Sequence, residues 1–246
     1  MINSAFILCG GKGTRLGQIT QNTPKPLVKV NNKEVIHYII NELIVLGIKN
    51  IILITGHLHE QFDDFIKYQN ERFIGANIKI KKLIEDKPLG TAGLIIKNIN
   101  QINENILVVN GDSFFRSDLF LKHKIKNFST KDNSLVRSIY ISNSNRYGLL
   151  DINKENNSIS NINEKQNANK SGYINSGLYI FNIKELLLYK KSNINKEIIS
   201  FEYDVFPFLI KKKLLKTFHS LNNIFLDIGI PEDFKKAPSF LKENLS

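Results

Sequence analysis

The stretch from residue 5 to residue 26 constrains the fold more strongly than any other part of the chain. It opens with the short apolar run AFILC at residues 5–9 and passes directly into the glycine-rich run GGKG at residues 10–13. An apolar run of this length is too short for a typical helix and indicates a strand buried in a parallel sheet. Because glycine has no Cβ, the run that follows can turn tightly and let its backbone approach a ligand. The stretch therefore predicts an α/β fold whose first strand ends at a binding loop.

The residues around and after the glycines supply groups that bind phosphate. Successive N–H groups of a glycine-rich turn can point into one concavity and hold phosphate oxygens. Thr14 and Arg15 add a hydroxyl group and a planar cation, and Lys25 stands between Pro24 and Pro26. The two prolines restrict the backbone on both sides of Lys25, so its ammonium group is presented from a stiff loop. We expect phosphate groups to bind here.

Two common phosphate-binding motifs are excluded by the spacing. A P-loop requires its lysine to be followed by Ser or Thr, but Lys12 is followed by Gly13. The dinucleotide fingerprint requires a glycine three residues after Gly13, where this chain has Leu16. For the glycine-rich run taken alone, a plain structural turn stays the alternative.

Downstream of this loop, strand-like and helix-like patterns alternate. Strand patterns occupy residues 50–55, 78–83 and 106–109, and helix patterns occupy residues 34–46, 61–67 and 91–99. Alternation at this spacing predicts a doubly wound, mostly parallel, Rossmann-like mixed sheet flanked by helices. Ligands of such sheets bind beyond the carboxyl ends of the strands.

From about residue 135 the pattern becomes richer in strands. Strand patterns occupy residues 135–141, 147–152, 158–162 and 173–181, and helix patterns occupy residues 204–211 and a last segment from residue 231. Asparagine-rich turns separate the strands, and no Pro/Gly/Ser-rich linker divides the chain. We therefore expect a single domain over residues 1-246, in which residues 135-246 form a β-rich extension of residues 1-134.

The net charge of +11 admits nucleic acid, a membrane surface or anionic small molecules as partners. The basic residues are scattered, and their densest run, at residues 211–213, follows an apolar helix pattern, so a solvated helix end explains it. Aromatic residues do not interleave with basic ones as they do in a nucleic-acid groove. We expect no binding to nucleic acid.

Apolar run length, the N-terminal sequence and the number of cysteines indicate the location of the protein. No apolar run approaches the roughly 18 residues that span a membrane, and no signal-peptide pattern opens the chain. The single cysteine, Cys9, excludes an internal disulfide and is expected to be a small buried residue. These features predict a cytoplasmic protein that does not bind membranes.

Two aspartates stand where a metal ion could be held. Asp112 follows an apolar strand pattern and Gly111, and Asp227 lies among apolar residues in the run FLDIGIPED at residues 225–233. A carboxylate in apolar surroundings is costly unless it is paired or bound to a metal. Mg²⁺ is usually held by one or two carboxylates together with substrate phosphates and waters. A turn aspartate that caps the next segment is the alternative for Asp112.

The full string GGKGTRL, with TPKP about ten residues further on, resembles the signature of the sugar-1-phosphate nucleotidylyltransferases. The other matching motifs are PLGTAG at residues 88–93, NGD at 110–112, RYG at 146–148, EK at 164–165, NSG at 175–177 and DIGIPED at 227–233. The resemblance extends over residues 5–233, and Cys9 stands where the family usually has alanine. We expect no β-helix extension, and the nearest branch is the short GDP-mannose-type and heptose-1-phosphate guanylyltransferases.

The resemblance implies an enzyme that converts a nucleoside triphosphate and a sugar 1-phosphate to a nucleotide-sugar and pyrophosphate, for surface-polysaccharide precursors. It assigns catalysis to Arg15, Lys25 and Asp112, and the binding of Mg²⁺ to Asp112 and Asp227. The nucleotide-binding residues it implies are Leu8, Gly10, Gly11, Gly13, Thr14, Glu85, Pro88, Gly90 and Thr91. The sugar-phosphate-binding residues it implies are Tyr147, Gly148, Glu164, Lys165 and Asn175. Residues 1-134 would then be the nucleotide-binding half, and residues 135-246 the sugar-binding half with the second metal ligand.

The base preference follows from Glu85, which occupies the position that reads the edge of the base in this family. A carboxylate offers only hydrogen-bond acceptors, and guanine presents adjacent N1–H and N2–H₂ donors. Glu85 therefore predicts GTP, and the resemblance implies a heptose or hexose 1-phosphate as the acceptor. A cytidylyl- or uridylyltransferase acting on another phosphate acceptor stays open, and a surface acid is the alternative for Glu85.

Two further classes of protein are weighed against this enzyme. One is a catalytically silent nucleotide-sugar-binding protein, against which the intact Arg15, Lys25, Asp112 and Asp227 argue. The other is a nucleic-acid-binding protein, which rests on the charge alone. The expected partners are the nucleoside triphosphate and the sugar 1-phosphate, and a homodimer is left open.

Overall fold

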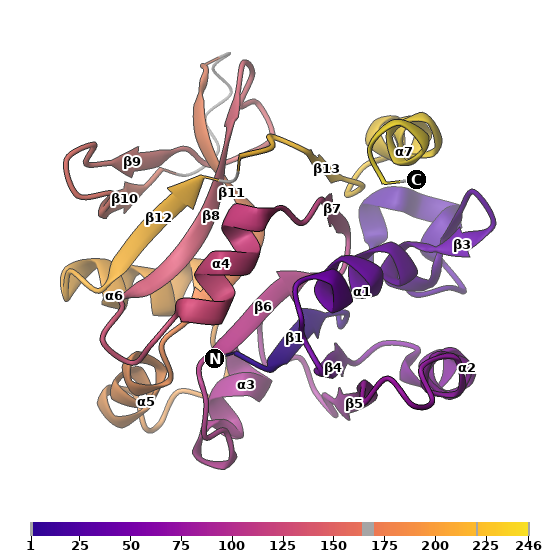
Figure 1. Ribbon diagram of the computed structural model, residues 1–246, viewed down its shortest axis with the longest axis horizontal. Coiled ribbons are helices and arrows are strands. Elements are labelled where there is room, and N and C mark those ends of the chain that lie inside the picture. Colours follow the sequence, from indigo (N-terminus) through magenta and orange to yellow (C-terminus); the bar gives the residue numbers. More distant parts are fainter. Residues whose placement is uncertain (1, 164–169, 220, 246) are drawn as a thin grey trace. The chain divides into compact units, whose positions relative to one another are not determined.

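The computed structural model describes residues 2–163, 170–219 and 221–245 (Figure 1). The chain forms two compact units of interleaved segments. The first, here called the glycine-loop unit, comprises residues 3–88, 109–122 and 224–246. The second, here called the β8–β11 unit, is built mainly from residues 89–108 and 123–223.

The glycine-loop unit contains three parallel strands that end together. They are β1 (Ser4–Leu8), β4 (Asn50–Thr55) and β5 (Lys79–Ile84). In their register Leu8 lies opposite Ile54, and Ile54 lies opposite Leu83. The helices of this part are α1 (Val35–Val45) and α2 (Phe62–Arg72). Because parallel strands finish at one edge, the loops that follow β1, β4 and β5 are neighbours.

Two short antiparallel strand pairs and a last helix also belong to this unit. The strands β2 (Lys29–Val30) and β3 (Lys33–Glu34) pair with each other, and β7 (Ser113–Phe115) pairs antiparallel with β13 (Phe225–Asp227). The helix α7 (Pro231–Asn244) begins at a proline and carries acids in its first turn, as the sequence predicts. The pairing of β13 with β7 explains why the last segment joins the glycine-loop unit, whereas a sequential division at residue 135 would separate it from that unit.

The β8–β11 unit contains the longest strands of the chain. The strand β8 (Ser134–Ile141) pairs antiparallel with β11 (Gly172–Phe181) and parallel with β12 (Leu215–His219), and Figure 1 shows the three side by side. The strand order continues from β11 to β6 (Ile106–Asn110). A separate antiparallel pair is formed by β9 (Leu150–Ile152) and β10 (Ile159–Ile162).

Short helices come before, between or after these strands along the chain. They are α3 (Gly93–Lys97), α4 (Leu119–Asn127), α5 (Ile183–Ser192) and α6 (Phe206–Lys211). A π-helical turn over Phe201–Val205 leads into α6, and Ser200 caps it by accepting from two backbone N–H groups. Where the sequence predicts one helix over residues 204–211, α6 begins at Phe206, and the π-helical turn extends the helical segment back to Phe201. The predicted strand over residues 147–152 begins later, at Leu150, because Tyr147 closes a turn onto the carbonyl oxygen of Ser144.

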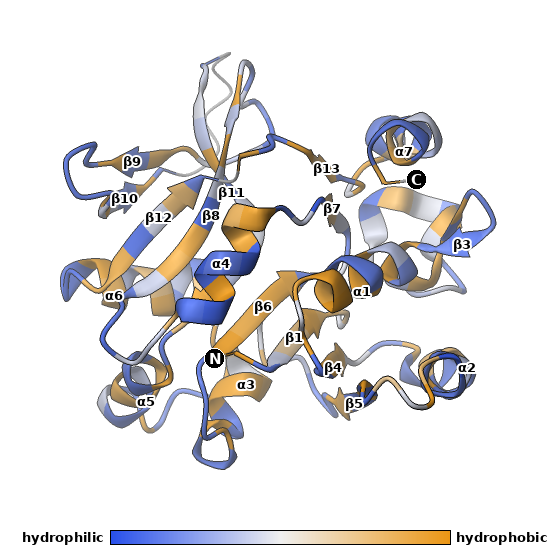
Figure 2. Ribbon diagram, in the orientation of Figure 1, coloured by the Kyte–Doolittle hydropathy of each residue, from blue (hydrophilic) through white to orange (hydrophobic). Residues whose placement is uncertain are grey.

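The predicted α/β class is confirmed by the sheet strands and their burial. The four residues from Ile106 to Val109 are almost completely buried, and β6 is coloured as hydrophobic along most of its length in Figure 2. The strands β1 and β4 carry similar apolar runs. The pairings of β1 with β4, of β4 with β5 and of β8 with β12 are parallel. The pairing of β8 with β11 is antiparallel. The sheet is thus mixed and mostly parallel.

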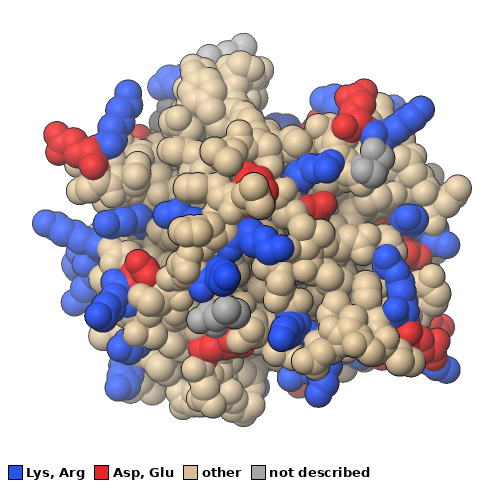
Figure 3. Space-filling model, in the orientation of Figure 1, with Lys and Arg blue, Asp and Glu red and all other residues tan. Residues whose placement is uncertain are grey.

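Charged side chains are dispersed over the face drawn in Figure 3, where basic and acidic groups alternate with uncharged surface. The three lysines at residues 211–213 are exposed at the end of α6, as expected for a solvated helix end. Among the residues that the structure describes, no helix combines the length and the apolar character needed to cross a membrane.

Candidate active site

The glycine-rich loop after β1 is anchored on one side and open on the other. Gly13 has a φ of 65°, and Thr20 donates from Oγ1 to its carbonyl oxygen at 2.8 Å. A Cβ on Gly13 would come within 3.0 Å of the Thr20 methyl group, so both the backbone angle and the packing favour glycine. Leu16 and Thr20 are buried, whereas Thr14 and Arg15 are exposed. The loop therefore presents a hydroxyl group and a guanidinium group on its outer side.

The first two glycines of the loop have different surroundings. A Cβ on Gly10 would come within 2.9 Å of Oε2 of Glu85, whereas a Cβ on Gly11 would meet no heavy atom within 4 Å. Gly10 thus has the end of the Glu85 side chain as a close neighbour, and Gly11 faces open space. The backbone at Gly11 is the part of the loop that a ligand can approach.

Lys25 and Asp112 form a short ion pair between segments that are far apart in the sequence. Lys25 Nζ donates to Asp112 Oδ2 at 2.6 Å, and the two side chains are 15% and 29% exposed. Pro24 and Pro26 on either side of Lys25 are both buried, so the backbone that carries the ammonium group is held on both sides. The ion pair therefore connects the proline-flanked loop that carries Lys25 with Asp112, which follows β6.

Gly111 brings Asp112 close to the end of β1. Its N–H donates to the carbonyl oxygen of Leu8 at 3.0 Å. A Cβ there would lie 2.7 Å from that same oxygen and 3.2 Å from both Cys9 Sγ and Pro26 Cγ, so only glycine permits this approach. Burial, and secondarily the negative charge of Asp112, raises the pKa of the Cys9 thiol well above its usual range. Cys9 is the small buried residue that the sequence predicts.

Asp227 is brought to Asp112 by the pairing of β7 with β13. Asp227 lies directly opposite Ser113, and the N–H of Ile228 donates to the backbone oxygen of Asp112 at 3.1 Å. Asp227 Oδ1 also accepts from the N–H of Gly229. Two half-buried carboxylates on neighbouring backbone segments are a donor set that suits Mg²⁺ when phosphate oxygens and waters complete its shell. The residues present therefore fit a magnesium ion held by Asp112 and Asp227.

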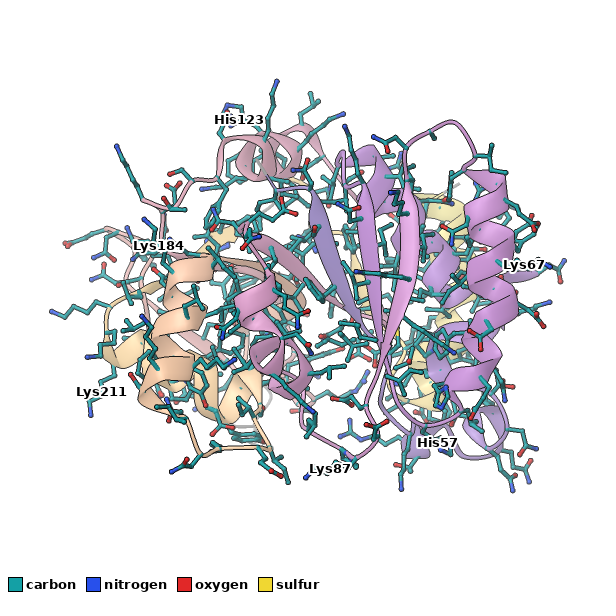
Figure 4. All side chains as sticks on the ribbon, turned by 90° about the horizontal axis from the view of Figure 1, so that it is seen from below. His57, Lys67, Lys87, His123, Lys184 and Lys211 are labelled. Atoms are coloured by element: carbon teal, nitrogen blue, oxygen red, sulfur yellow. The ribbon has the colours of Figure 1, made fainter. Side chains whose placement is uncertain are left out.

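Glu85 lies at the edge where β1, β4 and β5 end. Its N–H donates to the carbonyl oxygen of Thr55 at 2.7 Å, and its Oε2 comes close to Gly10 and Gly56, the glycines that follow β1 and β4. Figure 4 shows His57 and Lys87, which follow β4 and β5, at the same end of this unit. The absence of side chains at the two glycines makes room for a carboxylate beside the glycine-rich loop. Pro88 follows as an exposed residue.

The rest of the predicted base-binding segment packs within the β8–β11 unit. Gly90 has a φ of 81°, and a Cβ there would lie 2.4 Å from the carbonyl oxygen of Ile199. Thr91 Oγ1 donates to Glu202 Oε2 at 2.9 Å and accepts from the N–H of Phe201 at 2.8 Å. The turn at Gly90 and Thr91 is therefore positioned by the segment that precedes α6. Sequence reasoning missed Glu202, because the two residues are separated by 111 positions and no local pattern links them.

Asn175 is held by two neighbours on β11. Its side-chain Nδ2 donates to the hydroxyl oxygen of Tyr179 at 2.9 Å, and its Oδ1 accepts from the N–H of Gly177 at 2.8 Å. The strand register shifts between Asn175 and Tyr179, which places the NSG motif in a bulge. The amide of Asn175 therefore has a defined orientation from which it can meet sugar hydroxyl groups.

Tyr147 and Gly148, two more of the predicted sugar-phosphate residues, lie in the turn before β9. A Cβ on Gly148 would lie 2.4 Å from the carbonyl oxygen of Asn163, and the guanidinium group of Arg146 lies 5.3 Å from the ring centre of Tyr147. Gly148 thus permits close contact of two backbone segments. Glu164 and Lys165 lie outside the residues that the structure describes.

The structure brings the charged candidates together within one unit. Lys25, Asp112, Asp227 and Glu85 all belong to the glycine-loop unit, as do the loop residues that end with Arg15. Gly90, Thr91, Tyr147, Gly148 and Asn175 belong to the β8–β11 unit. Anion-binding amides, two cations and two carboxylates are the groups that a phosphoryl-type transfer requires.

Comparison with known proteins identifies the family. A model of the nucleotidyl transferase family matches residues 4–244. The chain belongs to the nucleotidyl transferase family. It is 33% identical over 232 residues to D-glycero-alpha-D-manno-heptose 1-phosphate guanylyltransferase of Campylobacter jejuni, covering 94% of this chain and 96% of that protein. The enzyme of the same name from Aneurinibacillus thermoaerophilus is 34% identical over 241 residues, covering 97% and 98%.

A solved structure agrees with the sequence relatives. The crystal structure of HddC from Yersinia pseudotuberculosis, complexed with GMP-PN, has a TM-score of 0.77 and 30% identity, and the match covers 97% of this chain and 99% of that chain. The family predicted from the glycine-rich loop and the later motifs is thereby confirmed, and with it the expectation of a nucleotidyltransferase enzyme. The roles of individual residues stay predictions.

Proposed function

We propose that this chain transfers a guanylyl group from GTP to a sugar 1-phosphate, with a heptose as the preferred sugar, and releases pyrophosphate. The observation that carries the proposal is the convergence of Lys25, Asp112 and Asp227 beside the glycine-rich loop. The names of the relatives from Campylobacter jejuni and Aneurinibacillus thermoaerophilus support guanine as the base and a heptose as the sugar. Mannose 1-phosphate is the second acceptor to consider, because mannose-1-phosphate guanyltransferase beta-A of Xenopus laevis is 31% identical over 94% of this chain.

The proposed reaction is a direct displacement at the α-phosphorus of GTP. An oxygen of the sugar phosphate forms a bond to that phosphorus, and the bond from phosphorus to the bridging oxygen of pyrophosphate breaks. Magnesium, when bound by Asp112 and Asp227, would neutralise charge on the phosphate oxygens. The amides of the glycine-rich loop and Arg15 hold the departing pyrophosphate, and Lys25 binds phosphate oxygens. Positioning and charge neutralisation thus supply the rate enhancement, with no covalent enzyme intermediate.

The base would be read by Glu85. Its carboxylate lies where β1, β4 and β5 end, beside Gly10 and Gly56, whose lack of side chains makes room for it. The two oxygens can accept from N1–H and N2–H₂ of guanine together. The motifs of the family also assign Gly90 and Thr91 to the nucleotide, and Asn175, Glu164 and Lys165 to the sugar phosphate. These assignments follow the motifs of the family and stay proposals.

The product and the composition suggest where the enzyme works. A guanosine diphosphate sugar is an activated donor, so a glycosyltransferase is the class of enzyme that must consume it. We place the chain in the cytoplasm, in the supply of surface-polysaccharide precursors. A homodimer is also open, and a measurement of the molar mass in solution would test it.

The decisive experiment measures pyrophosphate release with Mg²⁺ for each of GTP, CTP, UTP, ATP and dTTP. The acceptors are D-glycero-α-D-manno-heptose 1-phosphate, mannose 1-phosphate and glucose 1-phosphate. We expect GTP to exceed the other triphosphates in kcat/KM by about ten- to a hundredfold, the scale of one bidentate base contact. Preference for CTP or UTP would overturn the guanine assignment alone, and no release with any pair would overturn the proposed function.

A further inference from the structure

Three aromatic rings lie together on one face of the β8–β11 unit, and each comes from a different strand. They are Tyr140 on β8, Tyr173 on β11 and His219 on β12. The ring centres of Tyr173 and His219 are 4.4 Å apart with the planes tilted by 32°, and those of Tyr140 and Tyr173 are 5.4 Å apart in an edge-to-face contact. His219 is exposed, and 49% of Tyr140 is exposed. We call these three residues the aromatic cluster.

The strand register explains how the rings meet. Tyr173 lies opposite Tyr140, and His219 lies beside Ser138. Residues opposite one another in a sheet point to the same face, so all of these side chains share one face. β12 and β11 lie on opposite sides of β8, about 10 Å apart. The small side chain of Ser138 leaves the space above β8 in which the rings of Tyr173 and His219 come into contact.

The ring of His219 has a fixed orientation. Its Nδ1 makes a 2.7 Å hydrogen bond with Ser138 Oγ, which also pairs with Thr217 Oγ1 at 2.6 Å. Because Nδ1 is hydrogen-bonded to Ser138, Nε2 on the opposite edge of the ring is the nitrogen that can meet a ligand. The cluster thus offers an aromatic surface with a directed polar group, which is the composition of a small-molecule binding site.

Asn175 places the aromatic cluster next to the proposed sugar site. It lies opposite Ser138 on the same face, two residues from Tyr173 along β11. At Tyr179, which is 1% exposed, this face of the sheet is part of the core. At the other end, near Tyr173 and Tyr140, the same face is accessible to solvent. Two residues of a strand span about 7 Å, the scale of one sugar ring. A sugar that meets Asn175 can therefore extend its far end over the aromatic cluster.

We propose that the aromatic cluster is the subsite for the exocyclic end of the acceptor sugar, and that Tyr173 and His219 determine specificity there. This inference rests on the proposed function. The polarised C–H groups of the sugar pack on the negative faces of the rings, and Nε2 of His219 hydrogen-bonds a hydroxyl group. A heptose 1-phosphate carries one more exocyclic carbon and hydroxyl group than a hexose 1-phosphate. The cluster therefore favours the heptose over mannose 1-phosphate.

The first test compares acceptors in variants of the cluster. Tyr173→Leu and His219→Gln are expected to lower kcat/KM for the heptose 1-phosphate by about two- to tenfold, the scale of one aromatic contact. For mannose 1-phosphate and for the KM of GTP we expect changes below about twofold. Tyr68→Leu, which replaces a 61% exposed tyrosine on α2 of the other unit, is the matched control.

A structural role for the cluster gives a different result. Cross-strand aromatic pairs also stabilise sheets, so thermal unfolding of each variant is measured in parallel. A lower unfolding temperature with an unchanged ratio of heptose to mannose activity would mean that the rings only support the sheet. That outcome overturns the proposed subsite.

The second test observes binding without turnover. The chain has five histidines, so the ring resonances of His219 can be assigned in the NMR spectrum by their loss in His219→Gln. We expect them to shift on titration with the heptose 1-phosphate, less with mannose 1-phosphate, and not with inorganic phosphate. No shift at saturating heptose 1-phosphate, with normal turnover, overturns the subsite and leaves the proposed function intact. No turnover with any pair overturns the proposed function, while the titration still reports on the subsite.

Discussion

The two units of this chain prepare for a ligand in opposite ways. In the glycine-loop unit, charged groups from distant segments meet one another, as Lys25 and Asp112 do at 2.6 Å. In the β8–β11 unit, the neutral candidate residues that the structure describes are oriented by hydrogen bonds, as Asn175 is by Gly177 and Tyr179. Fixed charges stabilise a transition state, whereas neutral hydrogen bonds and rings discriminate between substrates. Substitutions of the residues that bind phosphate or metal in the first unit should therefore lower kcat, and substitutions in the second should change the preference for the acceptor.

The largest effect is expected from the two aspartates. Asp112→Ala and Asp227→Ala should each lower kcat by about 10²–10⁴-fold, because either change removes a ligand of the metal that neutralises the phosphates. EDTA should have a comparable effect on the unmodified chain. The measurement is pyrophosphate release, with Asp63→Ala as a control, since Asp63 is an exposed acid of the same unit that pairs with Lys82. Full activity in EDTA or in the Asp227 variant would refute the two-carboxylate site.

Arg15 should follow in magnitude. Arg15→Ala is expected to lower kcat by roughly 10²–10³-fold, the cost of one lost preorganised donor at the developing charge. Because the side chain is exposed, thermal unfolding should not change. The control is Lys67→Ala, which removes an exposed cation from α2 (Figure 4). A fall of less than about threefold would remove Arg15 from the mechanism.

Glu85 tests whether the units divide the substrates between them. Glu85→Gln exchanges one acceptor oxygen for a donor, so the preference for GTP should fall by about ten- to a hundredfold, towards UTP or dTTP. The ranking of sugar 1-phosphates should stay as it is. Steady-state kinetics for each triphosphate provide the measurement. A changed sugar ranking, or an unchanged triphosphate ranking, would break the proposed division.

The smallest effect concerns stability and lies away from the chemistry. His37 on α1 pairs through Nδ1 with Gln69 at 3.1 Å, and burial, followed by the charges of Arg72 and Lys33, lowers its pKa below 6.5. Below about pH 6.5 the unfolded chain therefore takes up a proton before the folded chain does, so stability falls as the pH decreases towards the folded pKa.

Unfolding temperatures at pH 7.5 and pH 5.5 check this expectation. The unmodified chain should lose more stability between these values than His37→Gln, which lacks the titrating ring. Equal losses in both proteins would show that His37 does not contribute to the pH dependence.

Some elements followed directly from local patterns in the sequence. The apolar run at residues 50–55 predicted β4 with its observed bounds, and the helical spacing at residues 34–46 predicted α1 to within a residue at each end. The helix α5 was not predicted, because three consecutive leucines obscure the helical period. The strand β7, which has three residues, was not predicted either. Elements this short carry no periodic signal of their own.

The sequence by itself determined the family, the glycine-rich loop and the list of candidate residues. These depend on local requirements, such as a positive φ at Gly13 or an apolar run before it, which neighbouring residues express. Only the tertiary structure decided that Lys25 meets Asp112, that β13 brings Asp227 beside it, and that three strands assemble the aromatic cluster. Strand pairing and register join residues about a hundred positions apart, and they are set by the packing of the whole unit rather than by any local sequence pattern.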